Sequence, residues 1–181
     1  MCLNQHKKII QISIANQPEL VRMKKEIVID RGNPDHLAEI QRLFVDTISS
    51  VCNVDYNAEQ IKVWTSSIEN KERWDDIISN QYVLIAKYDE SIVGFATLSK
   101  SNYIDLFYVH KDFQGLKIAS LLYYNIELEV LRNGQSEISA DVSITARPFF
   151  EKMGFQVLKE QTVFRQNVEF INYKMKKVLF K

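Results

Sequence analysis

The chain has 181 residues, 46% of them apolar, and its 23 basic and 23 acidic side chains leave a formal net charge of zero. This length and composition are typical of one globular domain with a single core. Because a neutral chain has no overall positive field, we expect neither a nucleic acid nor a membrane surface as its partner.

The two cysteines, Cys2 and Cys52, do not have the spacing of a metal site or of a redox pair. We expect both thiols to be reduced, which together with the lack of a signal-like segment predicts a cytoplasmic protein without a metal. Cys52 has no basic neighbour in the sequence to lower its pKa, so a structural role is expected. The longest apolar runs have the length of a strand and are too short for a membrane-spanning helix.

Residues 1–22 differ from the rest of the chain. Their apolar run, residues 9–15, is interrupted by Gln11 and Ser13. We expect a loosely held extension that precedes a single domain at residues 23–181, with an additional edge strand as the alternative.

The first predicted elements are a strand and three helices. Alternation over residues 25–30 indicates the strand. Residues 33–35, Asn-Pro-Asp, combine an N-cap, a proline at the first helical position and an acid in the first turn. Apolar residues then recur at the helical period as far as residue 48. Two further helices are expected at residues 57–67 and 70–79.

The pattern then changes to strands. Residues 82–88 and 92–98 are largely apolar and flank the polar residues 89–91, which predicts a hairpin. Another strand, residues 103–110, precedes a helix at residues 116–131.

The last part of the chain adds one helix and three strands. Thr145 is the expected N-cap of the helix at residues 146–153, because Pro148 then falls in the first turn, and Gly154 ends the helix. The strands are expected at residues 138–142, 155–163 and 170–178. This element order predicts an α/β fold with a mixed sheet and helices on both faces.

The most informative segment is residues 103–122, where a strand, a short charged turn and a helix follow one another, with Gln114 and Gly115 at the joint. A helix that begins at the end of a strand presents unpaired backbone N–H groups and the positive end of its dipole. Such a joint binds a phosphate group without needing a particular side chain. The sequence therefore predicts an anion site here.

Residues 114–119, QGLKIA, resemble the Gln/Arg-x-x-Gly-x-Gly/Ala motif of the GNAT superfamily of N-acetyltransferases, and residues 146–155, ARPFFEKMGF, resemble its Ala-x-x-Phe-Tyr-x-x-x-Gly-Phe motif. The resemblance extends over residues 27–179. It implies a three-layer arrangement with a central, mostly antiparallel sheet of about seven strands, splayed between the fourth and fifth strands.

The resemblance also implies an activity, namely acetyl transfer from the co-substrate acetyl-CoA to a primary amine of a small molecule or peptide, by direct attack in a ternary complex. Pantetheine would pair with the backbone of Phe107, Tyr108 and Val109, and one of their amides would stabilise the oxyanion. The pyrophosphate would be held by the joint, that is, by Gln114, Gly115, Leu116, Lys117, Ile118, Ala119 and Ser120.

Two residues depart from the family's motifs. Lys117 stands at the first glycine of the cofactor motif. Since a left-handed conformation would cost a lysine about 1 kcal/mol or more, we expect Lys117 in the first helical turn, with its ammonium near a phosphate. Phe150 stands where many relatives have a tyrosine that protonates the leaving thiolate. Water or another tyrosine would replace it, or the thiolate would leave unaided.

Asp105 and Tyr108 are the candidate catalytic residues. Asp105 is the first choice as the base for the amine, because alternate residues of a strand face the same way and Phe107 marks the cleft. His110, after the same strand, and Asp141, on the neighbouring strand, are alternatives. A solvated or capping carboxylate is the competing interpretation of Asp105.

The candidate acceptor-binding residues are Tyr56, Trp64, Trp74 and Ser143. A ring that lines the pocket would stack on an apolar or cationic part of the acceptor. Packing in the core is the alternative for the aromatic residues, and a turn is the alternative for Ser143. Acidic side chains that would attract a cationic amine, or simply lie on solvated helix surfaces, are Asp46, Asp55, Glu59, Asp75 and Asp76.

Two other functions fit parts of the sequence. Phe150 and Lys117 are compatible with a sensor that keeps an acyl-CoA site but has weak or no catalysis. A protein-interaction module that uses the sheet surface alone is weaker, since it leaves the phosphate joint unexplained. A monomer and a homodimer paired through residues 168–173 both remain open.

Overall fold

The computed structural model describes residues 10–11 and 26–179 of the chain. The expected N-terminal extension, residues 1–22, therefore lies outside the described residues except at Ile10–Gln11. These two residues form strand β1, which pairs antiparallel with β2, Glu26–Arg31.

The architecture is one eight-stranded sheet in the order β1-β2-β3-β4-β5-β6-β8-β7. The remaining strands are β3 (Tyr82–Tyr88), β4 (Ser91–Ser99), β5 (Tyr103–Val109), β6 (Glu137–Ser143), β7 (Gln156–Arg165) and β8 (Val168–Val178). Every neighbouring pair is antiparallel except β5 and β6.

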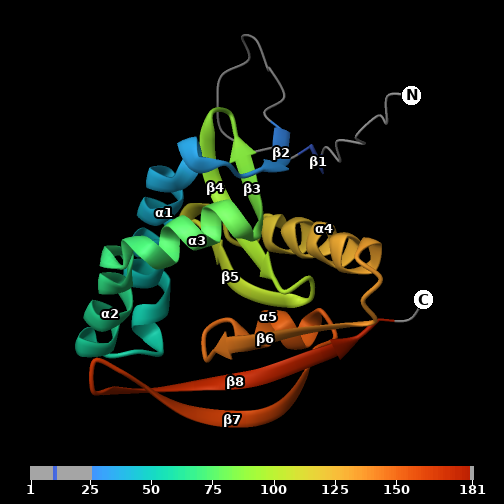
Figure 1. The fold of residues 1–181 in the computed structure, drawn as a ribbon. Helices are drawn as coiled ribbons and strands as arrows, with labels where there is room; N and C mark the ends of the chain where they lie inside the picture. Colours follow the sequence, from blue (N-terminus) through green and yellow to red (C-terminus); the bar gives the residue numbers. More distant parts are fainter. Residues whose placement is uncertain (1–9, 12–25, 180–181) are drawn as a thin grey trace, which may run out of the picture.

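The parallel pair β5–β6 is joined at two register positions only, Tyr103 with Ser139 and Ile104 with Ala140. Beyond these positions the strands diverge, and Figure 1 shows β6, β7 and β8 as a separate half of the sheet. The predicted splay between the fourth and fifth of the expected strands is confirmed.

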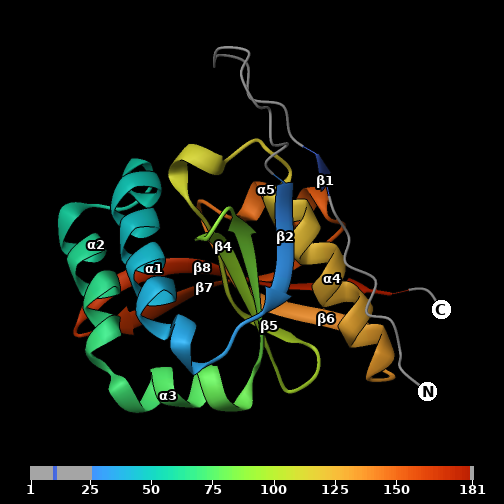
Figure 2. The same ribbon diagram turned by 90° about the horizontal axis from the view of Figure 1, so that it is seen from above.

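Helices cover both faces of the sheet, as predicted. Figure 2 shows α1 (Leu37–Val51), α2 (Ala58–Thr65) and α3 (Lys71–Asn80) on one side and α4 (Ile118–Arg132) with α5 (Arg147–Lys152) on the other. Short 3-10 helices complete the chain at Pro34–His36, Cys52–Val54, Ser66–Glu69 and Lys111–Phe113.

Each face of the sheet has its own core. Leu122, Tyr123 and Ile126 of α4 are buried in the core on one face, and Trp74 of α3 and Phe95 of β4 are buried in the core on the other. Burying these side chains supplies most of the free energy that holds the layers together. No helix in the described part of the chain is long and apolar enough to cross a membrane.

Side-chain caps fix where the 3-10 helix before α1 and the helix α2 begin. The Asn33 side chain accepts a hydrogen bond from the Asp35 amide at 3.0 Å, as the Asn-Pro-Asp pattern predicts. At α2, Asn57 Oδ1 accepts from the Gln60 amide and Gln60 Oε1 accepts from the Asn57 amide, both at 2.9 Å. This reciprocal pair satisfies two N–H groups that the helix cannot satisfy itself.

A β-bulge interrupts β5 at Asp105. Leu98 pairs with Ile104 and Thr97 pairs with Leu106, so Asp105 has no partner residue on β4. The Leu106 amide donates to the Thr97 hydroxyl at 3.1 Å. An extra residue in one strand breaks the alternation of its side chains, and here Asp105 and Leu106 both project toward the face covered by α1 and α3.

A charged cluster of Lys177, Tyr123 and Glu127 connects strand β8 to helix α4. Lys177 Nζ on β8 donates to Tyr123 Oη at 2.8 Å and to Glu127 Oε2 at 2.7 Å, and Tyr123 also bonds Glu127. Burial and Glu127 raise the pKa of Tyr123, so its phenol stays protonated. The cluster therefore links β8 to a helix that packs mainly on β3 and β4.

Replacing Lys177 with Met should lower the free energy of unfolding by about 1–2 kcal/mol, because Glu127 and Tyr123 lose a partner in a largely buried place. The two charged side chains are 22% and 24% exposed. Lys176→Met is the matched control, since its ion pair with Glu137 is 35% and 44% exposed and should contribute less than about 1 kcal/mol. Urea unfolding measures both variants, and equal losses would contradict the prediction.

Candidate active site

Two cavities meet where β5 separates from β6. The α4-side cavity, of about 410 Å³, lies among β5, β6, the N-terminus of α4 and α5. The hairpin-side cavity, of about 820 Å³, lies on the opposite face among α2, α3 and the β7–β8 hairpin. Five residues line both cavities: Trp64, Asp105, Tyr108, Asp141 and Ser143. A molecule in either cavity therefore reaches the same group of side chains.

The α4-side cavity contains the predicted cofactor residues, with one exception. Its lining includes Phe107, Tyr108, Val109, Gln114, Gly115, Lys117, Ile118, Ala119 and Ser120. Leu116 packs against the core on the α4 face and does not line the cavity.

The turn into α4 differs from the expectation at Lys117. Gly115 and Lys117 have φ angles of 74° and 64°, and the helix begins only at Ile118. The expected place of Lys117 in the first helical turn is therefore wrong: Lys117 is the N-cap, in the left-handed conformation that costs a side chain about 1–2 kcal/mol. Two left-handed residues within three positions let the chain reverse from the strand into the helix.

The first amides of α4 point into the α4-side cavity without acceptors of their own. Lys117 makes no side-chain cap, and the first intrahelical bond at this end runs from Leu121 N to Lys117 O at 3.0 Å. The N–H groups of Ile118, Ala119 and Ser120 therefore have no acceptor within the helix. Together with the helix dipole they form an anion site at the joint that the sequence predicts.

Two further amides face the gap along β5. The His110 amide donates to Val93 O on β4 at 2.9 Å, and the Leu106 amide also points to β4. Because successive amides alternate between the two edges of a strand, the Tyr108 amide points to β4, and those of Phe107 and Val109 point to the edge that β6 has left. Of the three amides that the sequence nominates, these two are directed into the gap.

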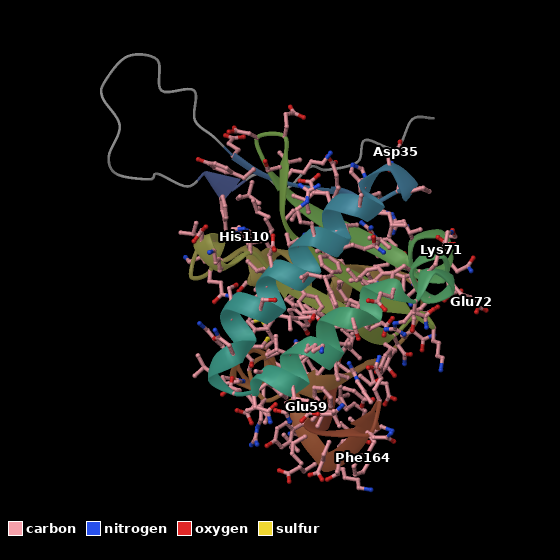
Figure 3. The ribbon with its side chains drawn as sticks, turned by 90° about the vertical axis from the view of Figure 1, so that its left-hand side faces the viewer. Asp35, Glu59, Lys71, Glu72, His110 and Phe164 are labelled. Atoms are coloured by element: carbon pink, nitrogen blue, oxygen red, sulfur yellow. The ribbon has the colours of Figure 1, made fainter. Side chains whose placement is uncertain are left out.

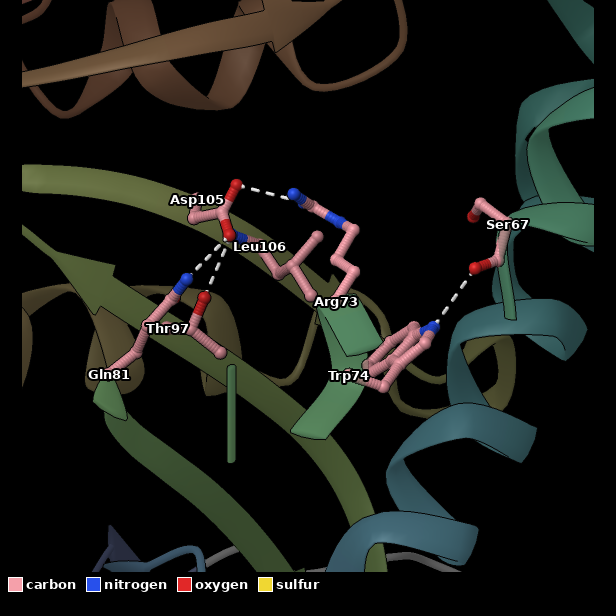
Figure 4. A network of polar contacts seen from close by, with 7 residues as sticks. All are labelled: Ser67, Arg73, Trp74, Gln81, Thr97, Asp105 and Leu106. Carbon is pink, nitrogen blue, oxygen red and sulfur yellow. Dashed lines mark hydrogen bonds and ion pairs between the residues drawn. The ribbon is translucent and has the colours of Figure 1, made fainter. Parts of the chain in front are cut away.

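Asp105 lies at the junction of the cavities, held by two side chains. Arg73 Nη2 donates to its Oδ1 at 3.0 Å and Gln81 Nε2 donates to its Oδ2 at 2.8 Å (Figure 4). The expectation that Asp105 and Phe107 share one face is wrong, because the bulge turns Asp105 toward α3. Phe107 instead packs against Phe149 on the α4 face, with ring centroids 5.4 Å apart.

The Tyr108 ring fills the space between the cavities. Its centroid lies 4.9 Å from Phe44 and 5.4 Å from Phe95. Burial raises the pKa of Tyr108 strongly, against the opposing effects of Arg165 and of a hydrogen bond with Trp64. The phenol is therefore protonated at neutral pH and is a poor proton donor.

The aromatic acceptor candidates surround the hairpin-side cavity. Tyr56 Oη donates to Ile171 O at 3.1 Å and accepts from the Ile144 amide at 3.0 Å. Trp74 Nε1 donates to the Ser67 carbonyl at 3.2 Å. Their hydrogen-bonding groups are thus occupied, so these two rings offer the cavity mainly apolar surface.

Ser143 has the turn role that was one of its two interpretations, and no side chain caps α5. Ser143 Oγ accepts from the Ala146 amide at 3.1 Å, whereas Thr145 Oγ1 donates to Asp55 Oδ2 at 2.7 Å. The expected Thr145 cap is therefore wrong, since Asp55, distant in sequence, competes for its hydroxyl. The helix begins at Arg147 rather than at residue 146.

Other candidates lie away from the two cavities. His110 accepts from the Asp112 amide at 3.3 Å, and Figure 3 shows it far from the hairpin end marked by Phe164. The acidic residues Asp46, Asp55, Glu59, Asp75 and Asp76 line neither cavity. Within the described residues, no group of three His, Cys, Asp or Glu side chains is placed to hold a metal ion.

Several functional candidates come from segments where the sequence gives no local signal. Arg73 and Gln81 contact Asp105, and Gln161 Nε2 on β7 donates to Asp141 Oδ1 at 3.3 Å. Arg165 lines the hairpin-side cavity from the end of β7. The contacts of Arg73, Gln81 and Gln161 join residues at least 20 positions apart in the sequence. The position of Arg165 depends on how the β7–β8 hairpin packs against the helices.

A family model described as an acetyltransferase (GNAT) domain matches residues 52–177 of the chain. The N-acetyltransferase YafP of Escherichia coli, itself uncharacterized, is 30% identical over 150 residues, which cover 83% of this chain and 95% of that protein.

Solved structures agree with this match. A GCN5-related N-acetyltransferase from Rhodopseudomonas palustris gives a TM-score of 0.80 at 29% identity, over 83% of this chain and 94% of that one. The PaiA N-acetyltransferase of Thermoplasma acidophilum, solved in complex with coenzyme A, gives a TM-score of 0.68 at 19% identity, over 84% and 98% of the two chains. The second match is a likeness of fold.

Cys52 is buried and lines the α4-side cavity. Burial raises the pKa of its thiol from 9.0 to about 11, opposed by a hydrogen bond with Thr145. Because only the thiolate is nucleophilic, the raised pKa keeps Cys52 unreactive at neutral pH.

In a Cys2→Ser protein, whose single remaining thiol is Cys52, iodoacetamide should react at pH 8 about 100-fold more slowly than with a free thiol of pKa near 8.5. The rate should rise about tenfold per pH unit up to pH 10, since the thiolate fraction does so below a pKa of about 11. Mass spectrometry of quenched samples gives the rates, with the urea-unfolded protein as the control. A rate that levels off near pH 9 would contradict the raised pKa.

Proposed function

The chain belongs to the GNAT superfamily of N-acetyltransferases, and we propose that it transfers an acetyl group from acetyl-CoA to a primary amine by direct attack in a ternary complex. The observation that carries the proposal is the meeting of two cavities at five shared side chains. The backbone amides that line one cavity suit the phosphates of an acyl-CoA, and the other cavity would admit an acceptor from the opposite face.

The acyl-CoA occupies the α4-side cavity. Its pyrophosphate binds the free amides of Ile118, Ala119 and Ser120 at the positive end of the α4 dipole, with the Lys117 ammonium beside it. Its pantetheine arm pairs with the edge of β5 that β6 leaves unpaired. The complex of the Thermoplasma acidophilum relative with coenzyme A supports this choice of ligand.

The reaction needs little covalent chemistry from the protein. The neutral amine attacks the thioester carbonyl from the hairpin-side cavity and forms a C–N bond, while the carbonyl oxygen becomes an oxyanion. The amide of Phe107 or Val109 stabilises that charge. The tetrahedral intermediate then loses the extra proton of its nitrogen to water and collapses, so that the C–S bond breaks and the sulfur leaves as a thiolate.

No strong acid is required for the thiolate. A thiol with a pKa near 8.5 is a tolerable leaving group at neutral pH, and neither Phe150 nor Tyr108 can assist it. Phe150 has no proton to give, and the raised pKa of Tyr108 makes its phenol a weaker acid than the thiol. Water in the cavity protonates the sulfur after it leaves.

Asp105 accepts the proton of the acceptor's ammonium, directly or through water. Gln81 holds Oδ2, and the half-exposed Arg73 side chain can give up Oδ1 to the substrate. Asp141 lies at the same junction and is the alternative base.

The first test is calorimetric titration with acetyl-CoA of the wild type, Lys117→Gly and Lys117→Glu. We expect Lys117→Glu to weaken affinity about tenfold or more, because it reverses a charge beside the phosphates. Lys117→Gly removes the ammonium but suits the left-handed backbone. It should weaken affinity about two- to fivefold while raising the free energy of unfolding by about 1 kcal/mol. No binding by the wild type would overturn the proposed function.

The second test compares Asp105→Asn with Asp141→Asn in thiol release from acetyl-CoA, with an amine panel and pH varied from 6 to 9. Loss of a general base lowers kcat about 10²- to 10⁴-fold, and we expect this loss for Asp105→Asn with a smaller one for Asp141→Asn. Thermal melts and acetyl-CoA affinity control for damage to the fold. A larger loss in Asp141→Asn would reassign the base.

A further inference from the structure

We propose that the acceptor is an α-amino acid with an apolar side chain, whose ammonium takes the place of Arg73 at Asp105 and whose carboxylate binds Arg73 and Arg165. This inference rests on the proposed function, because it concerns the acceptor of that same site. Three features of the hairpin-side cavity carry it: an ion pair in its wall, a second arginine without an ion pair, and an aromatic lining.

The ion pair favours an acceptor with both charges. Asp105 is 14% exposed and Arg73 is 47% exposed, with Oδ1 and Nη2 3.0 Å apart. A simple ammonium that bound Asp105 would leave the half-exposed Arg73 guanidinium to water alone, whereas an acceptor with its own carboxylate gives the guanidinium a new anion. An amino acid exchanges one ion pair for two, so each protein charge keeps a partner.

Arg165 supplies a second positive charge at the mouth of the cavity. It lies at the end of β7, and among the described residues it makes no ion pair. Its guanidinium lies 5.6 Å from the Phe170 ring centroid. Its charge also opposes the burial effect on the pKa values of Tyr56 and Tyr108, so its field reaches the interior of the cavity.

The hairpin that carries Arg165 is fixed to the helical face. Gln166 Nε2 donates to Ser66 Oγ at 3.2 Å, and Gln60 Nε2 donates to Glu169 O at 2.8 Å. These contacts hold the turn of the hairpin and β8 against α2 and the 3-10 helix Ser66–Glu69. Arg165 is therefore held at the mouth of the cavity, where a carboxylate would enter.

The aromatic residues of the lining favour an acceptor with an apolar side chain. The rings that line the cavity include those of Phe44, Tyr56, Trp64, Trp74 and Phe170. Glu69 and Asp141 also line it, and Asp141 is engaged by Gln161. A cavity of about 820 Å³ whose wall combines aromatic rings with polar and charged side chains suits a small molecule that is apolar at one end and charged at the other.

Three matched acceptors test the proposal: L-phenylalanine, L-phenylalaninamide and 2-phenylethylamine. All three carry an amine and a benzyl group, and only the first has a carboxylate. We expect kcat/KM for L-phenylalanine to exceed that for either of the others at least about tenfold. Arg165→Gln should lower this preference to below about threefold, mainly through KM, whereas Lys159→Gln on the same strand should preserve it.

Tryptophan fluorescence gives a readout that needs no turnover. The chain has two tryptophans, and Trp64 and Trp74 both line the hairpin-side cavity. Titration of the CoA-loaded protein should show tighter binding of L-phenylalanine than of its amide, and Arg165→Gln should remove the difference. Carboxylate-dependent binding without thiol release would support the acceptor site while contradicting the proposed catalysis.

The proposal is overturned if 2-phenylethylamine or the amide is acetylated as well as L-phenylalanine. It is also overturned if Arg165→Gln leaves the preference intact, or if none of the three compounds binds or reacts. If none of the three compounds binds or reacts but other amines of the panel cause thiol release, the proposed acetyl transfer stands and only the acceptor class is refuted.

Discussion

The separation of β5 from β6 is the constraint on which the rest of the structure depends. A parallel pair normally continues its ladder along both strands, yet here the register ends after Tyr103 and Ile104. The unpaired backbone of β5 leaves buried amides that must find other partners. The same gap opens a passage between the two faces of the sheet, which lets two cavities share a set of side chains.

An open gap in a sheet would weaken the fold unless other contacts crossed it. The Lys177 cluster joins β8 to α4. Hydrogen bonds also join the β7–β8 hairpin to α2 and to Ser66, which follows α2. Helices α4 and α2 lie on opposite faces of the sheet (Figure 2). The two half-sheets are thus held from both sides.

The sequence predicts the features that depend on local pattern. The helix face of α4, the strand that precedes it and the glycine at the joint are neighbours in the chain, so the anion site and most of its residues follow from one segment. The splay followed from the family resemblance rather than from any residue pattern. Phe107 and Val109 were also nominated in this way, although the sequence did not distinguish their amides from that of Tyr108.

The errors arise where a distant residue decides a local conformation. Asp105 changes face because a bulge forms opposite Thr97, and an alternation rule assumes that no bulge exists. Thr145 does not cap α5 because Asp55 takes its hydroxyl. Lys117 adopts a left-handed conformation because of the path from β5 to α4, despite its intrinsic preference. Arg73 and Arg165 reach the site only through tertiary packing, which no spacing in the sequence indicates.

The shared junction also bears on how such a protein can change over evolutionary time. The α4-side cavity is built mainly from the stretch between β5 and α5, whereas the hairpin-side cavity draws on α2, α3 and the β7–β8 hairpin. Substitutions in the second group can remodel what enters from that face without touching the groups that hold the other ligand. Five positions in the described part of the chain line both cavities, so these five are subject to both sets of demands. A lineage built on this plan can therefore diversify its acceptors by drift in the hairpin and the helical cover while its cofactor chemistry is inherited intact.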